Sequence, residues 1–224
     1  MERPQDITTP QPGRFPNRHA AMAVRLIIIF HLVGFIGLAI TQTRPLFLQL
    51  VPYHLLFMAL ILFFNHDRIT IKFIFFFVLI FILGFAAEWT GVHTSWPFGS
   101  YYYGKTLGLK LNDIPLIMGI NWFLLIYATG VTLQRSKVRQ VWVRIITGAI
   151  LLVLLDALIE PIANRLDYWH WLGTISVNNY ISWFVLSAIM LFIFELFGFK
   201  KQSMAGTVLL ISQFIFFALL LIIT

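Results

Sequence analysis

Long apolar segments alternate with shorter polar ones along almost the whole chain. A helix needs about 20 predominantly apolar residues to cross the hydrocarbon core of a bilayer, and seven segments meet this condition. Their residues do not alternate strictly between polar and apolar, as those of membrane β-strands do. The pattern therefore predicts an all-α, polytopic transmembrane bundle of seven helices, at 23–42, 46–64, 70–88, 114–133, 143–162, 180–198 and 204–223.

The remaining residues form a polar N-terminal stretch and the loops. Residues 1–20 contain four prolines, which is typical of a disordered tail, and they are poor in the small-residue cleavage signals of a secretory signal peptide. Two connections are long, at 89–113 and 163–179, and the others are short. Because we find no internal repeat and no second domain, we expect residues 21–224 to form a single transmembrane domain.

The composition agrees with burial in a membrane. Of the 224 residues, 59% are hydrophobic and 11% are charged, whereas soluble domains have about 45–50% apolar and about 25% charged residues. In lipid every backbone polar group must be paired internally, which helices achieve. The chain has no cysteine, and this excludes disulfide bonds, thiolate metal sites and cysteine nucleophiles.

The basic residues indicate the orientation of the bundle. With the N-terminus in the cytoplasm, 12 of the 16 lysines and arginines fall in cytoplasmic segments, and the other 4 are Arg44, Lys105, Lys110 and Arg165. Such a bias is typical of multi-pass proteins. We therefore expect a cytoplasmic N-terminus and a place in the inner (plasma) membrane. The same rule explains the net charge of +7 without a nucleic-acid partner.

Four acidic residues are the main chemical clue. Acidic side chains are costly inside a membrane and usually mark a functional site. On the predicted topology Glu88, Asp113, Asp156 and Glu160 all lie in the outer half, and the last two share one helix face at i,i+4 spacing. The two long connections beside them are rich in tryptophan and tyrosine. We therefore expect a polar pocket beneath an aromatic lid, with ligand contacts from Tyr101, Tyr103, Asn121, Trp122, Asn179 and Trp183.

Each of these residues also has a structural interpretation. Tryptophan and tyrosine commonly form an aromatic belt at the membrane interface. Asp113 fits a helix N-cap or a partner of Lys110, and Glu160 fits an ion pair with Arg165. Glu195, near two lysines at the inner end of its helix, fits a charge that extends toward water.

Several kinds of site are not indicated by the sequence. It has no H-E-x-x-H or D-D-x-x-D motif, no P-loop, no dinucleotide fingerprint and no serine nucleophile elbow. We therefore expect no metal ion. The scarcity of basic residues on the outer side argues against a prenyl-diphosphate transferase. The residues alone predict a carboxylate-rich pocket for an apolar ligand, but they do not identify a reaction.

Several segments together resemble the membrane carotenoid 1,2-hydratases of the CruF type, the group that includes the bisanhydrobacterioruberin hydratases. The resemblance covers about residues 85–185, with one departure: this chain lacks a proline near Val177. The matching segments are EWTGV at 88–92, PFGSYYY at 97–103, LG at 107–108, IPL at 114–116, NW at 121–122, Asp156 with the EP pair at 160–161, YWHW at 168–171, NY at 179–180 and Trp183.

The resemblance implies a reaction, a substrate and partners. The reaction is the addition of water to the C1–C2 double bond of a carotenoid ψ-end, which gives a tertiary alcohol. The protein would then be a hydro-lyase of carotenoid, and thus isoprenoid, biosynthesis that needs no cofactor. Its substrate would be γ-carotene, lycopene or a related carotenoid within the bilayer, and its partners would be other membrane enzymes of the same biosynthesis.

The candidate residues are suited to this chemistry. Hydration of such an alkene begins when an acid protonates the less substituted carbon, and a carboxylic acid holds its proton more readily in apolar surroundings or beside a second carboxylate. We expect Asp156 to be the acid, with Glu160 or Glu88 acting on the water. The aromatic rings of Tyr101, Tyr103, Trp122 or Trp183 would face the developing cation, and Asn121 and Asn179 would hold the water.

Two other functions remain open at this point. A carotenoid end-group cyclase also protonates an isoprenoid alkene, but its product has the mass of the substrate, whereas hydration adds one water. A carotenoid- or lipid-binding membrane protein or transporter would leave the pigment unchanged. A transporter should also show paired halves or interrupted helices, and neither is clear in the sequence.

Overall fold

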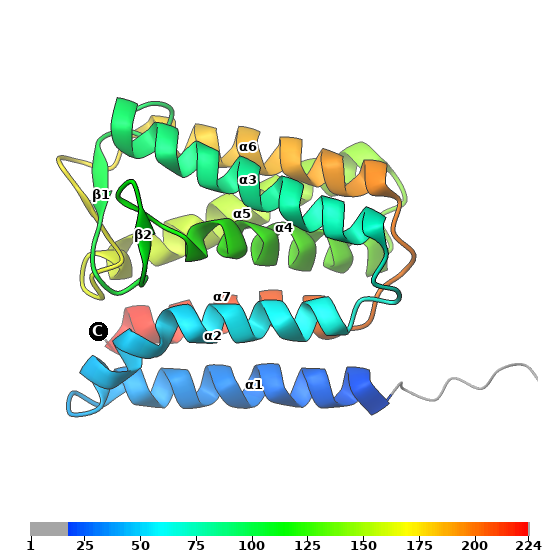
Figure 1. Cartoon of the computed structure of the whole chain (residues 1–224), viewed down its shortest axis with the longest axis horizontal. Coiled ribbons are helices and arrows are strands. Elements are labelled where there is room, and N and C mark those ends of the chain that lie inside the picture. The colour runs from blue at the N-terminus through cyan, green and yellow to red at the C-terminus, as the bar shows by residue number, and fades with distance from the viewer. Residues whose placement is uncertain (1–17, 224) are drawn as a thin grey trace, which may run out of the picture.

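The computed structural model describes residues 18–223, so the predicted tail at 1–20 lies almost entirely outside the described residues. Within them, seven helices are long and apolar enough to cross a membrane, which confirms the predicted polytopic helical bundle (Figure 1). The helices are α1 (Arg18–Ala39), α2 (Arg44–Phe64), α3 (Ile71–Thr94), α4 (Ile117–Arg135), α5 (Val141–Ala163), α6 (Val177–Phe197) and α7 (Ala205–Ile223).

The long connections contain short strands that were not predicted. β1 (Tyr101–Tyr103) pairs antiparallel with β4 (Trp169–Trp171), so the connection after α3 is joined to the one after α5. β2 (Lys110–Leu111) pairs with β3 (Ile114–Pro115) in a hairpin. We call residues 95–116 and 164–176 together the lid.

One predicted boundary is wrong because of this hairpin. The fourth helix was expected to begin at residue 114, with Asp113 as a candidate N-cap. Instead α4 begins at Ile117, and Asn112 and Asp113 form the hairpin turn with φ angles of 47° and 65°. Asparagine and aspartate tolerate this left-handed conformation better than most residues, and paired positive φ angles suit a two-residue hairpin. Asp113 is therefore an exposed turn residue.

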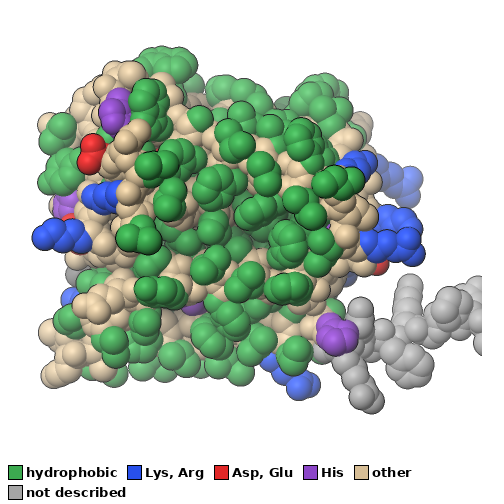
Figure 2. All heavy atoms as spheres, viewed as in Figure 1, with side chains coloured by type: hydrophobic (Ala, Val, Ile, Leu, Met, Phe, Trp, Pro, Cys, Tyr) green, Lys and Arg blue, Asp and Glu red, His purple; other side chains and the backbone are tan. Residues whose placement is uncertain are grey.

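The two ends of the bundle differ. The lid lies at one end, which we call the lid end, and the connections 65–70, 136–140 and 198–204 lie at the other, which we call the basic end (Figure 1). Figure 2 shows hydrophobic side chains over the middle of the visible face and lysine and arginine side chains toward both ends. An apolar belt between charged ends is what a bilayer requires of a spanning protein.

Helix α4 occupies the centre of the bundle. It contacts α2, α3, α5, α6 and α7, and 78% of its most apolar stretch is buried, against 22–44% for the other six helices. It is also the least hydropathic of the seven. The low hydropathy of α4 agrees with its central position. Helices that face lipid must be apolar, whereas a helix enclosed by protein can carry polar groups that meet partners on its neighbours. Helix α4 can therefore place side chains in an interior site.

Candidate functional site

The carboxylate of Glu88 on α3 is bound by three neutral donors. The hydroxyl groups of Tyr101 and Tyr103 donate to its Oε2 at 2.7 and 2.6 Å, and the indole Nε1 of Trp122 donates to its Oε1 at 2.9 Å. Glu88 is 4% exposed. The tyrosines come from β1 and the tryptophan from α4, so this one carboxylate joins α3, the lid and the central helix.

Two glycines on the same face of α3 allow Trp122 and Tyr101 to come close to this helix. A Cβ atom on Gly84 would lie 2.5 Å from the side chain of Trp122, and one on Gly91 would lie 2.7 Å from the Tyr101 hydroxyl oxygen. Both distances are shorter than real Cβ contacts. The glycines therefore let the indole and the phenol come close enough to α3 to reach the Glu88 carboxylate.

The two tyrosines remain hydrogen-bond donors over the whole physiological pH range. Burial, together with the neighbouring Glu88 carboxylate, raises the pKa of the Tyr101 and Tyr103 hydroxyls well above its usual value. Their O–H groups consequently stay in place, and they hold Glu88 without supplying a positive charge.

A second group of polar residues lies on α5 and α6. Asn179 donates through one Nδ2 atom to Oδ2 of Asp156 at 2.9 Å and to Oε1 of Glu160 at 3.3 Å. Oε2 of Glu160 accepts from the indoles of Trp169 at 3.2 Å and Trp171 at 2.7 Å. All three polar residues are buried. The predicted i,i+4 pair is thus bridged by an amide.

The partners of Glu160 come from the lid and not from a basic residue. Within residues 18–223 the ion pairs are Arg144–Glu195 and Asp167–His170, so the suggested Glu160–Arg165 pair is absent there. Asp167 fastens the lid instead. Burial would raise the pKa of this carboxyl, but hydrogen bonds from His170 and the Lys105 backbone outweigh that effect and hold it below its usual value.

Two cavities meet at Asp156. A large one, of about 480 Å³, extends between α1, α2 and α7 on one side and α4 and α5 on the other, and its lining is mainly apolar. A small one, of about 20 Å³, is lined by the three carboxylates and Asn179 together with lid aromatics. Asp156 and Trp183 line both cavities.

Two pairs of aromatic rings pack beside the carboxylates. The rings of Trp122 and Trp183 stack with centroids 4.5 Å apart, and the rings of Tyr101 and Trp171 are 5.2 Å apart. By contrast, Trp89, Trp96 and Tyr102 are exposed, as expected for an aromatic belt. The aromatic residues of this end therefore divide into a group that encloses the carboxylates and a group at the surface.

The structure brings together most residues that the sequence singled out. Asn121 lines the large cavity. Asp113 is the exception, since it lies in the exposed hairpin turn, and its suggested partner Lys110 donates to the Tyr103 carbonyl. The other predicted site residues line the small cavity or bond directly to its carboxylates. They are Glu88, Asp156, Glu160, Tyr101, Tyr103, Trp122, Asn179 and Trp183.

Sequence reasoning did not assign site roles to several residues of this region. Trp169 and Trp171, which bind Glu160, were noted in the sequence only as part of an aromatic loop and of the YWHW segment. His31, His54 and Gln213 line the large cavity from α1, α2 and α7. Their spacing along the chain gives no recognisable motif, because three different helices contribute them. Among the described residues, no group of three or more histidine, aspartate or glutamate side chains is placed to hold a metal ion.

Comparisons with known proteins identify the family. Residues 49–224 match the family described as "Carotenoid biosynthesis protein". The chain belongs to this carotenoid biosynthesis protein family. The bisanhydrobacterioruberin hydratase of Haloarcula japonica is 24% identical over 131 residues, which are 55% of this chain and 44% of that protein. The match thus spans less than half the length of the relative. No solved structure matches the chain.

These findings confirm the resemblance noted in the sequence. The matched residues 49–224 include every carboxylate of the small cavity and the whole lid. They exclude all of α1, which contributes Phe30, His31 and Gly34 to the wall of the large cavity. The match to the carotenoid biosynthesis family thus includes the polar site and residues from five of the six helices that line the large cavity, while α1 lies outside the matched range.

Proposed function

We propose that this protein is a carotenoid hydratase, a hydro-lyase that adds water to the C1–C2 double bond of a carotenoid ψ-end without a cofactor. The observation that carries the proposal is the position of Asp156, which lines both the large apolar cavity and the small polar one. One carboxyl group can therefore face an isoprenoid chain on one side and a water molecule on the other. γ-Carotene, lycopene and related carotenoids are the proposed substrates.

The large cavity suits the end of a carotenoid. Its volume of about 480 Å³ is within the range of about 300–1,000 Å³ that is common for ligand sites. Its wall includes Phe30, Val33, Leu50 and Tyr53, whose side chains are also exposed on the outside of α1 and α2. A carotenoid held with its ψ-end inside would thus leave the rest of its polyene in the surrounding lipid.

The small cavity suits the second substrate, water. A buried water molecule requires a cavity volume of about 10–15 Å³ and two to four polar partners. The cavity has about 20 Å³ and is lined by Glu88, Asp156, Glu160 and Asn179. Because Trp169 and Trp171 already occupy Oε2 of Glu160, we assign the water to Asp156, Asn179 and Oε1 of Glu160.

The reaction proceeds in two proton transfers. The carboxyl group of Asp156 gives its proton to C2 of the alkene, and the π-electrons form the new C–H bond, which leaves a tertiary cation at C1. Oxygen of the water then bonds to C1, and the proton that this oxygen loses passes to the Asp156 carboxylate, directly or by way of Glu160, so that the acid is restored. Trp183 lines both cavities and, stacked on Trp122, presents an electron-rich face to the cation.

The neutral donors around the carboxylates suit this cycle. A carboxylate that is held by tyrosine, tryptophan and asparagine can gain or lose a proton without breaking an ion pair. Glu88 has all three of its partners within hydrogen-bond distance and lies beside the cavity. We assign it a positioning role, in which it fixes Tyr101, Tyr103 and Trp122 around the reacting end.

The proposal includes the orientation of the protein. We place the lid end at the outer side and the basic end in the cytoplasm of a cell whose inner (plasma) membrane holds the protein, because most lysines and arginines lie at the basic end. Other carotenoid-biosynthesis enzymes in the same membrane would supply the substrate and use the product, because a carotenoid does not leave the lipid phase.

The test is expression of the chain in bacteria that accumulate lycopene and γ-carotene, with the pigments separated by chromatography and weighed by mass spectrometry. We expect a more polar pigment that is heavier by one water. Glu195→Gln, which changes a carboxylate far from the lid end, is the matched control and should form the same product. An isomer of unchanged mass would show a cyclase, and unchanged pigment that copurifies with the protein would show a carotenoid-binding protein.

A further inference from the structure

The large cavity is shorter than a carotenoid. Its lining residues on α2 run from Phe47 to Phe57, which is a length of about 15 Å at about 1.5 Å per residue. An extended carotenoid is about 30 Å long, comparable to the thickness of the hydrocarbon core of a bilayer. With its reacting end at Asp156, about half of such a ligand lies outside the cavity. The wall therefore needs an opening through which the chain can pass.

The two ends of the cavity are closed. Toward the basic end, the next side chains on α1 and α2 are Ile27, Met58 and Leu62, and all three are buried. Toward the lid end, Leu107 and Tyr168 of the lid form the wall, and both are buried as well. An opening for a long chain can therefore lie only in the side of the bundle.

The exposed residues of the wall show which side is open. Phe30 and Val33 on α1 and Leu50 and Tyr53 on α2 line the cavity and are exposed. The lining residues from α4, α5, α6, α7 and the lid are all buried or half-buried. Helices α1 and α2 lie side by side at the edge of the bundle (Figure 1). The large cavity thus opens toward lipid between these two helices.

Contacts between α1 and α2 limit the size of this opening. Toward the basic end, the rings of His31 and His54 have centroids 4.8 Å apart. Toward the lid end, the Phe47 ring lies so close to Gly37 that a Cβ atom there would overlap it. The rise from residue 31 to residue 37 is about 9 Å. One extended hydrocarbon chain needs about 8 Å between the atoms on its two sides, because carbon atoms in contact are about 4 Å apart.

The wall residues between these contacts suit an uncharged chain. They are Val33 and Gly34 on α1 and Leu50, Val51 and Tyr53 on α2, and we call them the α1–α2 window. None of them carries a charge, and Gly34 has no side chain that would fill the space. A slender hydrocarbon can therefore pass between the two helices without leaving a polar group unpaired.

We propose that the polyene of the ligand passes from the large cavity into the lipid through the α1–α2 window, so that the residues of the window determine which isoprenoid chains are accepted. The inference rests on the proposed function in placing an isoprenoid end at Asp156. It assigns the reacting end to the interior and the remaining chain to the outer surface of α1 and α2. A short isoprenoid fits inside the cavity and does not use the window.

A long and a short ligand test this proposal. Lycopene is long enough to occupy the window, whereas 2-methylhept-2-ene carries the same terminal alkene on a much shorter chain. Binding of each to the full chain in lipid nanodiscs is measured from the rise in melting temperature with ligand concentration. Val33→Trp places a large ring at the exposed edge of the window. It should lower the affinity for lycopene about tenfold relative to the affinity for the short alkene, as overpacking of a fitted site does.

Two further variants locate the effect. Ile36→Trp is the matched control, because Ile36 is exposed on the same helix but does not line the cavity, and it should keep the ratio of the two affinities. Leu50→Trp adds the same ring from the α2 side of the window and should reproduce the loss. It also takes the place of Val33→Trp if that variant does not fold.

Each outcome separates this inference from the proposed function. An unchanged ratio in Val33→Trp and Leu50→Trp would overturn the inference, as would an equal fall in Ile36→Trp or a natural protein that lycopene does not stabilise. Hydration of pigments by the same preparation would still stand in those cases. Conversely, a ratio that falls only in the window variants, together with no gain of water by any pigment, would uphold the window and refute the hydratase.

Discussion

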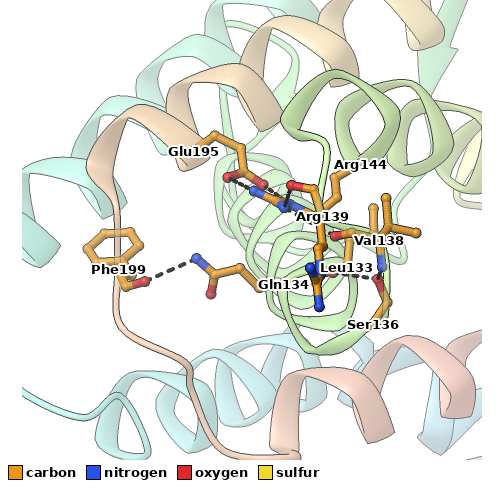
Figure 3. Close-up of polar contacts among 8 residues, drawn as sticks. All are labelled: Leu133, Gln134, Ser136, Val138, Arg139, Arg144, Glu195 and Phe199. Atoms are coloured by element: carbon orange, nitrogen blue, oxygen red, sulfur yellow. Dashed lines mark hydrogen bonds and ion pairs between the residues drawn. The ribbon is translucent and has the colours of Figure 1, made fainter.

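The carboxylates at the two ends of the bundle are paired in different ways. At the basic end, Glu195 on α6 accepts two hydrogen bonds of 2.7 Å from the Arg144 guanidinium on α5, and Arg144 also donates to the Val138 and Arg139 carbonyls (Figure 3). At the lid end, Glu88, Asp156 and Glu160 are held by phenols, indoles and an amide.

The difference distinguishes a structural carboxylate from one that is free to exchange protons. The Glu195 carboxylate is matched by a guanidinium, which is a permanent positive charge. Gln134, beside it in Figure 3, donates to the Phe199 carbonyl and helps fix the loop before α7. The lid-end carboxylates lose no ionic partner when they take up a proton. The suggestion that Glu195 merely extends toward water is thus wrong, because its side chain is 12% exposed and paired.

The largest effect is expected for Asp156→Asn. The variant keeps an oxygen that can accept from Asn179 but has no acidic proton, so the yield of hydrated pigment should fall by about 10²–10⁴-fold, the usual contribution of a general acid or base. The yield is measured by chromatography and normalised to the amount of protein in the membrane. A variant that is correctly inserted and retains full activity would contradict the role of Asp156.

Glu88→Gln should have the next largest effect. A glutamine offers one acceptor oxygen where Glu88 accepts from Tyr101, Tyr103 and Trp122, so at least one buried donor loses its partner. The free energy of unfolding should fall by about 1–3 kcal/mol. Unfolding in mixed micelles followed by tryptophan fluorescence measures this loss. Tyr103→Phe, which removes one donor and leaves the carboxylate with two, should cost less than Glu88→Gln.

A smaller effect is expected when the ion pair of the basic end is broken. Glu195→Gln leaves Arg144 near water, where it is 14% exposed, so the unfolding free energy should fall by about 1 kcal/mol, well below the cost for a fully buried pair. Pigment hydration should stay within a factor of about two, because no catalytic group changes. A loss of activity as large as that in Asp156→Asn would contradict the different roles that we assign to the carboxylates of the two ends.

The smallest effect is expected in the pH dependence of stability, through His66 in the connection between α2 and α3. His66 donates to or accepts from the Tyr127 hydroxyl at 2.8 Å and stacks on Phe73. Burial lowers the pKa of His66 to about 4, and nearby Asp67 opposes this only partly. The unfolded chain then binds the proton more readily, so the stability contributed by neutral His66 is present above about pH 6.5 and is lost as the pH falls toward 4.

Thermal unfolding at pH 7.5 and pH 5 tests this dependence. The melting temperature should be lower at pH 5, and His66→Gln, which keeps a polar group for Tyr127, should reduce the difference between the two values. His19→Gln replaces an exposed histidine and is expected to leave the difference unchanged. The prediction is wrong if His66→Gln and His19→Gln give the same pH dependence as the natural protein.

The sequence by itself determined the architecture. Apolar length decides which segments can span a bilayer, and this is a local property, so all seven helices were predicted. Their ends lie within a few residues of the prediction, except that α1 begins five residues earlier, at Arg18, and α3 ends six residues later, at Thr94. The motifs around Glu88, Asp156 and Glu160 likewise indicated both the family and the presence of a carboxylate site.

Only the tertiary structure decided how those carboxylates are held and what faces them. Glu88 and Trp122 are 34 residues apart, and Asp156 and Asn179 are 23 apart, so each bond depends on how the helices pack. Asp113 does not lie with the other three acidic residues, because it is in the turn of a hairpin and not at the start of a helix. The sequence did not bring His31, His54 and Gln213 together for the same reason, since α1, α2 and α7 each contribute one of these residues to the wall of the large cavity. Burial in lipid is decided by each segment alone, whereas a hydrogen bond needs two side chains that the chain brings together only when it folds.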